Sequence, residues 1–215
     1  MQQLNWSPRT ELGAKVAKGE LTSLDSILEK GFVILEPEIV DSLVPDMLNE
    51  VIYIGGSPGK GGGIRRTATR RTARMHKSGR RYKLTAMIVV GDEKGIVGLG
   101  VASSKEHRTA IEKALLAAKL NVIRVRKGCG SWECSCGGDH SIPFRTKGKA
   151  GSVTATLMPA PKGVGLVASN EVKKILRLAG LKDIWVATEG QTQTRLNLIT
   201  AIFQALKNMS RTKRL

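Results

Sequence analysis

A run of twenty residues, Ile64 to Lys83, constrains this chain more than any other feature. It contains seven arginines, two lysines and no acidic residue. Nine like charges repel one another, so the run cannot pack in isolation and needs an anionic partner. A solvated helix face is the alternative interpretation, but such faces normally alternate positive and negative charge. The run therefore predicts contact with a polyanion, of which nucleic acid is the commonest.

A glycine-rich segment, residues 55–63, precedes the basic run. Glycine is conformationally permissive, so we expect a flexible arm that follows an irregular RNA surface at close range. Each guanidinium can bridge two phosphate oxygens, and displaced counterions would make the binding strongly salt-dependent. Aromatic residues form only 4% of the chain, which disfavours base stacking and favours contacts with phosphates, 2′-hydroxyl groups and RNA shape.

The net charge of +17 is unevenly distributed along the 215 residues. Residues 1–50 carry nine acidic and four basic residues, whereas the remainder carries a net charge of +22. We therefore expect an acidic N-terminal extension, residues 1–50, that contacts protein, and a basic body that contacts phosphate. No apolar run approaches the ~20 residues of a membrane-spanning helix, and the N-terminus lacks the apolar core of a signal peptide. We expect a cytoplasmic protein with no membrane partner.

Hydrophobic periodicity divides the rest of the chain into two small α+β domains. The first, residues 51–137, has a hairpin of strands followed by a helix that Ser103 or Ser104 would cap. The second domain covers residues 138–207, and a basic tail, residues 208–215, is expected to be disordered until bound. The expected strands are 84–90, 95–102, 140–146, 152–158 and 183–187. The main expected helices are one within residues 18–30 with Thr22 or Ser23 as its cap, the helix after Ser104, 170–179 and 194–207.

Three cysteines and one histidine lie close together in a glycine-rich turn, as Cys129, Cys134, Cys136 and His140. Three thiolates and an imidazole suit tetrahedral Zn²⁺, which would organise a loop that has no core of its own. Four protein ligands would leave no open position for catalysis, so such a zinc would be structural. Three reduced cytosolic thiols in a surface loop are the alternative interpretation, and the sequence leaves both open.

The loop from Pro159 to Ser169 precedes a helix and resembles the phosphate loop of small-molecule kinases related to galactokinase. A helix N-terminus with bare backbone N–H groups binds anions in either setting. A kinase would also need acidic residues to hold Mg²⁺, but only nine acids lie beyond residue 50 and, apart from the neighbours Asp92 and Glu93, they are scattered singly. We keep the kinase as the less favoured alternative and expect neither an enzyme nor a small-molecule substrate.

Residues 79–100, GRRYKLTAMIVVGDEKGIVGLG, resemble the signature of the universal small-subunit ribosomal protein five family. Further matches lie at residues 151–153, 157–166 and 178–183, and the acidic segment 36–41 is similar to the archaeal and eukaryotic branch. The matches extend over nearly the whole chain. The resemblance implies a double-stranded-RNA-binding-like first domain and a βαβ-type second domain of the ribosomal-protein-five kind.

The same resemblance implies a structural constituent of the small ribosomal subunit. It would bind rRNA beside the entrance of the mRNA channel and the decoding region, and would contribute to translational accuracy and subunit assembly. The implied partners are small-subunit rRNA, mRNA and the neighbouring ribosomal proteins four and eight, with ribosomal protein two as the candidate partner of the acidic extension. Eukaryotic relatives lack the three thiols, so a metal would not belong to the shared function of the family.

The family also indicates where RNA contacts should lie. Residues 77–81 match a loop that touches rRNA in the family, whereas residues 103–108 match the lysine cluster of duplex-binding modules only thinly. We therefore do not predict binding of an RNA duplex by that mode. The expected RNA-binding residues are Lys60, Arg65, Arg66, Arg70, Arg71, Arg74, His76, Lys77, Ser78, Gly79, Arg80, Arg81, Lys83 and Lys162.

Overall fold

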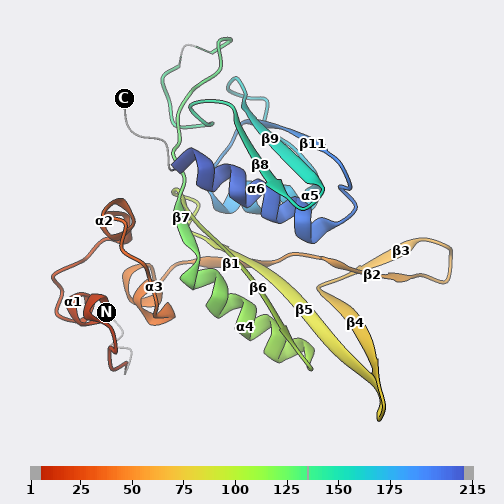
Figure 1. Ribbon diagram of the computed structural model, residues 1–215. Coiled ribbons are helices and arrows are strands. Elements are labelled where there is room, and N and C mark those ends of the chain that lie inside the picture. The colour runs from red at the N-terminus through yellow and green to blue at the C-terminus, as the bar shows by residue number, and fades with distance from the viewer. Residues whose placement is uncertain (1–5, 135, 211–215) are drawn as a thin grey trace.

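The computed structural model describes residues 6–134 and 136–210. Figure 1 shows a group of short N-terminal helices, a long sheet with one helix, and a second sheet with two helices. The α+β class with two small domains is confirmed. Most of the predicted basic tail lies outside the described residues, and its first three residues, 208–210, belong to the last helix.

The N-terminal extension contains the helices α1 (Glu11–Ala17), α2 (Leu24–Glu29) and α3 (Pro37–Leu43). The predicted cap of the helix in residues 18–30 is confirmed, because Ser23 occupies the N-cap position of α2, and the residues before it lie outside the helix. Gly19, with φ +78°, follows the end of α1 in the left-handed conformation that commonly terminates helices. Glu36, just before α3, accepts hydrogen bonds from the backbone N–H groups of Arg9 and Thr10 at 2.9 and 2.6 Å, which ties the start of α1 to α3.

The first domain is an antiparallel sheet covered on one face by the helix α4 (His107–Leu120). Its strands are β1 (Leu48–Val51), β4 (Thr69–His76), β5 (Gly79–Gly91), β6 (Ile96–Ser104) and β7 (Val122–Arg124). The strands β1 and β4 pair with different halves of the same edge of β5. The predicted hairpin is present, but the predicted serine cap is wrong because Ser103 and Ser104 still pair with β5, and Glu106 occupies the N-cap position.

The second domain has the strands β8 (Thr146–Ala150), β9 (Val153–Pro159), β10 (Leu166–Val167) and β11 (Ile184–Glu189). The helix α5 (Asn170–Leu178) joins the parallel pair β10 and β11, and α6 (Arg195–Ser210) covers β8 and β9. The strand predicted at 140–146 is wrong. Its residues bond to separate segments, since His140 accepts from Lys182 and Asp183 while Ser141 forms an isolated bridge to Gly128.

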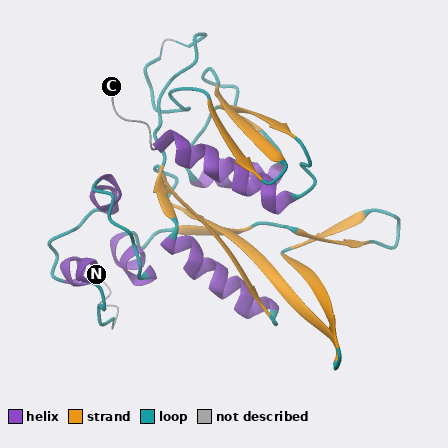
Figure 2. Cartoon of the chain, viewed as in Figure 1, coloured by secondary structure: helices purple, strands orange, loops and turns teal. Residues whose placement is uncertain are grey.

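Two hydrophobic clusters meet at β5, which lies between α4 and the second domain (Figure 2). Ala86, Ile88 and Val90 face α4 and the N-terminal helices. Met87 and Val89 face the opposite way and belong to the cluster that α5 and α6 complete. Because alternate residues of a strand point to opposite faces, one strand contributes to both layers of the core. The cluster under α5 and α6 contains side chains from both domains, so the two domains share it, whereas the cluster under α4 belongs to the first domain and the N-terminal helices.

Candidate nucleic-acid interface

The basic run folds into strands and not into the flexible arm that we expected. The strand β2 (Gly55–Pro58) pairs with β3 (Ile64–Thr67), and β4 pairs with the first half of β5 around a turn at Lys77 and Ser78. Gly79 follows that turn with φ +104°, a backbone conformation that favours glycine and is typical of hairpin turns. The buried half of β5 fixes the position of its exposed half, which gives β4 a strand with which to pair.

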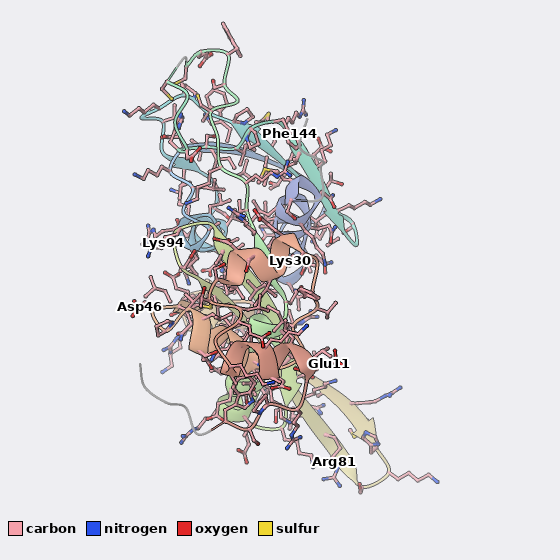
Figure 3. All side chains as sticks on the ribbon, turned by 90° about the vertical axis from the view of Figure 1, so that its left-hand side faces the viewer. Glu11, Lys30, Asp46, Arg81, Lys94 and Phe144 are labelled. Carbon is pink, nitrogen blue, oxygen red and sulfur yellow. The ribbon has the colours of Figure 1, made fainter. Side chains whose placement is uncertain are left out.

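The two faces of the β4–β5 hairpin differ in composition. Residues that pair directly across antiparallel strands point to the same face. One face therefore carries the side chains of Arg70, Thr72, Arg74, His76, Arg81 and Lys83. The other face carries Arg71, Met75, Arg80 and Tyr82, and the Arg71 guanidinium lies 4.7 Å from the centroid of the Tyr82 ring. Figure 3 shows side chains projecting from the end of this hairpin around Arg81.

The positive charge of these hairpins is not compensated within the described part of the chain. Every arginine and lysine from Lys60 to Lys83 is exposed, and in residues 6–134 and 136–210 none of them forms an ion pair with a carboxylate. Arg81 donates a hydrogen bond from Nη2 to Oγ of Ser78 at 2.9 Å, so Ser78 orients a cation. The two hairpins thus present a rigid, unpaired set of cations, the arrangement that binds phosphate.

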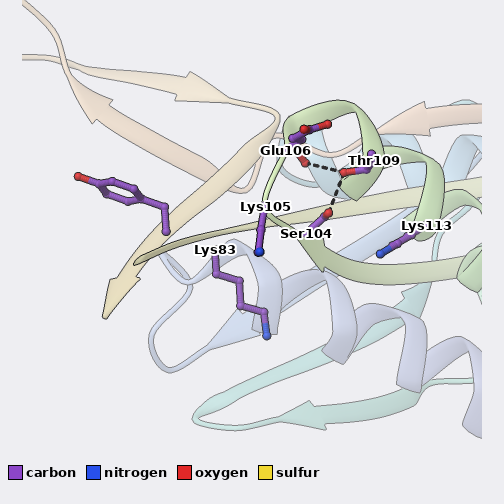
Figure 4. Close-up of a pocket in the computed structure, with 7 residues that line it drawn as sticks. Lys83, Ser104, Lys105, Glu106, Thr109 and Lys113 are labelled. Carbon is purple, nitrogen blue, oxygen red and sulfur yellow. Dashed lines mark hydrogen bonds between the residues drawn. The ribbon is translucent and has the colours of Figure 1, made fainter. Parts of the chain in front are cut away.

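A groove of about 600 Å³ lies where this hairpin meets the start of α4 (Figure 4). Its lining includes Lys83 from β5, Lys105 from the β6–α4 connection and Lys113 from α4. The Thr109 hydroxyl donates to Oγ of Ser104 at 2.7 Å, which fixes the first turn of the helix against the strand. Lys105 lies in the segment 103–108 that matches the lysine cluster of duplex-binding modules only thinly, and Lys113 was not among the expected RNA-binding residues. The sequence does not show this groove, because its lysines come from separate elements.

The cysteine cluster lies in the irregular loop between β7 and β8, at the far end of the molecule from the β4–β5 hairpin (Figure 1). The predicted residues come together, because one ligand atom from each of Cys129, Cys134, Cys136 and His140 lies within 4.8 Å of all the others. The bridge between Gly128 and Ser141 closes the base of the loop, with backbone hydrogen bonds of 3.0 and 3.1 Å.

Asp183 orients the histidine of this cluster. Its Oδ2 lies 2.9 Å from Nδ1 of His140, and both side chains are buried. A carboxylate accepts hydrogen bonds, so in the neutral imidazole Nδ1 carries the proton and Nε2 keeps its lone pair. That Nε2 faces Sγ of Cys134 at 3.9 Å. A histidine held by a carboxylate on one nitrogen and facing thiols with the other has the arrangement of a metal ligand.

The thiols do not share one environment. A hydrogen bond from the backbone N–H of Lys162, followed by bonds from Cys136, lowers the pKa of Cys134 to about 6. Burial and the neighbouring thiols of Cys136 and Cys134 raise the pKa of Cys129. Lys162, which we expected to bind RNA together with the arginine run, is exposed and lies beside this cluster.

The Pro159–Ser169 loop does not present its N–H groups to a ligand. Oδ1 of Asp183 accepts hydrogen bonds from the backbone N–H groups of Gly163 and Gly165 at 3.1 and 2.8 Å. A nucleotide phosphate would therefore meet a carboxylate of the protein itself in the loop. This arrangement argues against the kinase alternative, and it makes Asp183 the link between the glycine loop and the cysteine cluster.

We predict that Asp183→Ala destabilises the protein through this link. The substitution removes the partner of His140 and leaves two backbone N–H groups unpaired, so the free energy of unfolding should fall by about 2–4 kcal/mol. Urea unfolding followed by circular dichroism would measure the change. The matched control is Asp139→Ala, an exposed aspartate next to His140, which should change the free energy by less than about 0.5 kcal/mol. Equal effects of the two substitutions would contradict the role of Asp183.

Within the described residues, every helix is too short or too polar to cross a membrane. Residues 65–126 match the family model described as ribosomal protein S5, N-terminal domain, and residues 148–215 match that of ribosomal protein S5, C-terminal domain. The cysteine cluster lies between the two matched ranges.

Curated relatives cover nearly the whole chain. A small ribosomal subunit protein uS5 from Methanosphaera stadtmanae is 48% identical over 97% of this chain and 86% of its own length. The protein of the same name from Methanocaldococcus jannaschii is 46% identical over 97% of this chain and 89% of its own length. That from Pyrobaculum arsenaticum is 46% identical, over 94% of this chain and 93% of its own length.

Proposed function

The chain belongs to the ribosomal protein S5 family, and from that premise we propose that it is a structural, non-enzymatic constituent of the small ribosomal subunit in the cytoplasm. The observation that carries the proposal is the pair of exposed basic hairpins, whose cations have no carboxylate partner among residues 6–134 and 136–210. We infer that these hairpins bind rRNA. Ordered strands lose little conformational entropy on binding, which favours a fixed RNA contact over a loosely associated arm.

The finer placement follows the family resemblance. We propose that the protein lies beside the entrance of the mRNA channel and the decoding region, where it contacts rRNA and incoming mRNA and is adjacent to ribosomal proteins four and eight. A contribution to translational accuracy and to subunit assembly would follow from that position. The rigid connection between the hairpin and the core supports such a role, because a contact that sets RNA geometry must itself be held in place.

We predict that three arginines on one face of the β4–β5 hairpin contribute to the salt dependence of rRNA binding. Each phosphate contact adds about 0.7–0.9 to the slope of the logarithm of the association constant against the logarithm of salt concentration. Substituting Arg70, Arg74 and Arg81 by Ala should therefore reduce the slope by about 2 to 3. The measurement is filter binding of deproteinised small-subunit rRNA over a series of salt concentrations.

The control for this experiment removes the same number of exposed cations from the N-terminal extension. Substituting Lys15, Lys18 and Lys30 by Ala should leave the slope unchanged, because these lysines lie on the acidic part of the chain. If the hairpin variant kept the slope of the unmodified protein, the hairpins would be solvated surfaces and the proposal would be wrong.

We further propose that the cysteine cluster holds a structural Zn²⁺. The donor set of three thiols and one imidazole fits the metal, and the buried His140–Asp183 pair supplies the carboxylate that orients such a histidine. When bound, the ion would neutralise the thiolates, which repel one another when packed together without a cation. With four protein ligands it would organise the loop and take no part in catalysis.

We predict about one zinc ion per chain in the purified protein, since four protein ligands complete one tetrahedral site. Elemental analysis of Cys134→Ser should show a large loss of zinc. The variant His76→Ala, which removes a histidine from the hairpin and not from the cluster, should keep the metal. Retention of zinc by Cys134→Ser would place any bound metal elsewhere.

The acidic N-terminal extension is proposed to dock on a neighbouring protein, with ribosomal protein two as the candidate. Between α2 and α3 the chain exposes three large apolar side chains, those of Phe32, Val33 and Leu35, which are 46%, 74% and 66% exposed. Contiguous exposed apolar side chains mark a surface for protein contact, and the net negative charge of residues 1–50 disfavours RNA at this surface.

We predict that the double substitution Val33→Ser and Leu35→Ser reduces incorporation into small subunits. Truncating anchors of an interface costs upward of ~1 kcal/mol, so incorporation in competition with the unmodified protein should fall by about fivefold or more. Sucrose-gradient sedimentation of reconstituted subunits would measure it. The control Leu116→Ser alters a similarly exposed leucine on α4, and unchanged incorporation of the double variant would exclude this docking surface.

A further inference from the structure

We propose that Trp132 is an additional RNA contact, which stacks on an unpaired base of the rRNA beside the cysteine cluster. The inference rests on the proposed function and adds a second contact at the far end of the molecule from the basic hairpins. The low aromatic content disfavours an extended stacking platform, but a single base needs a single ring.

Trp132 is exposed on a part of the loop whose backbone is well held. Its side chain is 91% exposed. The N–H of Cys134 donates to the carbonyl of Ser131 at 3.3 Å, which closes a turn with Trp132 at its corner. The N–H of Glu133 donates to Oγ of Ser131 at 3.4 Å, and the N–H of Gly130 donates to the carbonyl of Ile142 at 3.2 Å.

These contacts separate Trp132 from an ordinary exposed apolar residue. Single exposed apolar side chains are common on proteins and need no partner. Here, however, the turn and the residue before it are hydrogen-bonded, and two members of the cysteine cluster, Cys129 and Cys134, bracket the tryptophan in sequence. A ring on a backbone that is already ordered loses little entropy when it binds, so the loop is preorganised to present the indole. Trp185, by contrast, lies half-buried on β11.

The surroundings of the turn favour RNA over protein. The backbone N–H of Lys162 bonds to the Cys134 thiol, and the backbone N–H of Lys182 donates to the carbonyl of His140 at 2.9 Å. Both lysine side chains are exposed. Lys127 is close enough to Asp139 and Lys182 to interact with both electrostatically, so three cations lie around the base of the loop against the two exposed acids Glu133 and Asp139. An RNA base could stack on the indole while its flanking phosphates contact the lysines, so RNA would use both the aromatic ring and the cations.

The test compares Trp132→Ala with Trp132→Phe in the full zinc-containing chain, with deproteinised small-subunit rRNA as the probe. Removing one base-stacking side chain should weaken binding about 5- to 100-fold, whereas phenylalanine should retain most of the affinity. The salt slope of Trp132→Ala should equal that of the unmodified protein, because stacking releases no counterions. Equal rRNA affinity of Trp132→Ala and the unmodified protein would overturn the proposal.

A second measurement does not depend on removing the side chain. In the variant Trp6→Phe, Trp185→Phe, all tryptophan fluorescence comes from position 132, and stacking on a base should quench it and shield it from iodide. Fluorescence that stays unquenched and accessible when rRNA is bound would overturn the proposal even if Trp132→Ala lost its zinc.

The remaining outcomes separate this inference from the function on which it rests. If Trp132→Ala binds rRNA normally but fails to enter reconstituted subunits, the indole docks on a protein and the RNA inference is wrong. If the hairpin variant Arg70→Ala, Arg74→Ala, Arg81→Ala loses affinity while Trp132→Ala does not, only the inference at Trp132 fails. If the hairpin variant also binds normally, the proposed function fails.

Discussion

The burial of β5 on both faces is the constraint on which the rest of the structure depends. From Leu84 onward the strand contributes alternate side chains to the core under α4 and to the core under α5 and α6. A shift of one residue would exchange these two sets, so the register of the strand is strongly specified. The same strand continues outward as one half of the basic hairpin. The hydrophobic core thereby fixes a surface that contains almost no hydrophobic residues.

A second organising point is the carboxylate of Asp183. It joins the glycine loop after β9 to the histidine of the cysteine cluster through three hydrogen bonds. The loop that resembles a phosphate-binding loop is thus occupied by a side chain of the protein itself. Its glycines let an oxygen atom approach the backbone N–H groups closely, whether that oxygen belongs to a phosphate or to a carboxylate of the protein. The sequence pattern alone is therefore compatible with both a kinase and a ribosomal protein.

Sequence patterns predicted the elements whose signals are local. The strands at 84–90 and 152–158 and the helix at 170–179 were found because their apolar periodicity extends over enough residues. The basic run was predicted to be a binding surface, and its strands were missed because their pairing depends on the distant buried half of β5. The lysine groove at Lys105 and Lys113 and the pairing of His140 with Asp183 were missed because both join residues from separate elements. The four members of the cysteine cluster are close in sequence and could be predicted.

The continuity of β5 also has a mechanical consequence. The β4–β5 ladder contains eight successive residue pairs from His76–Gly79 to Thr69–Ala86, and the strand then enters the core without a break. A force applied by RNA at the tip of the hairpin would act on this ladder, whose other end is fixed by the buried part of β5. Displacements at the tip would then be passed to the α4 and α6 layers as a tilt of the whole body, since close-packed interiors transmit strain with little compression. We therefore expect the hairpin and the core to move as one body.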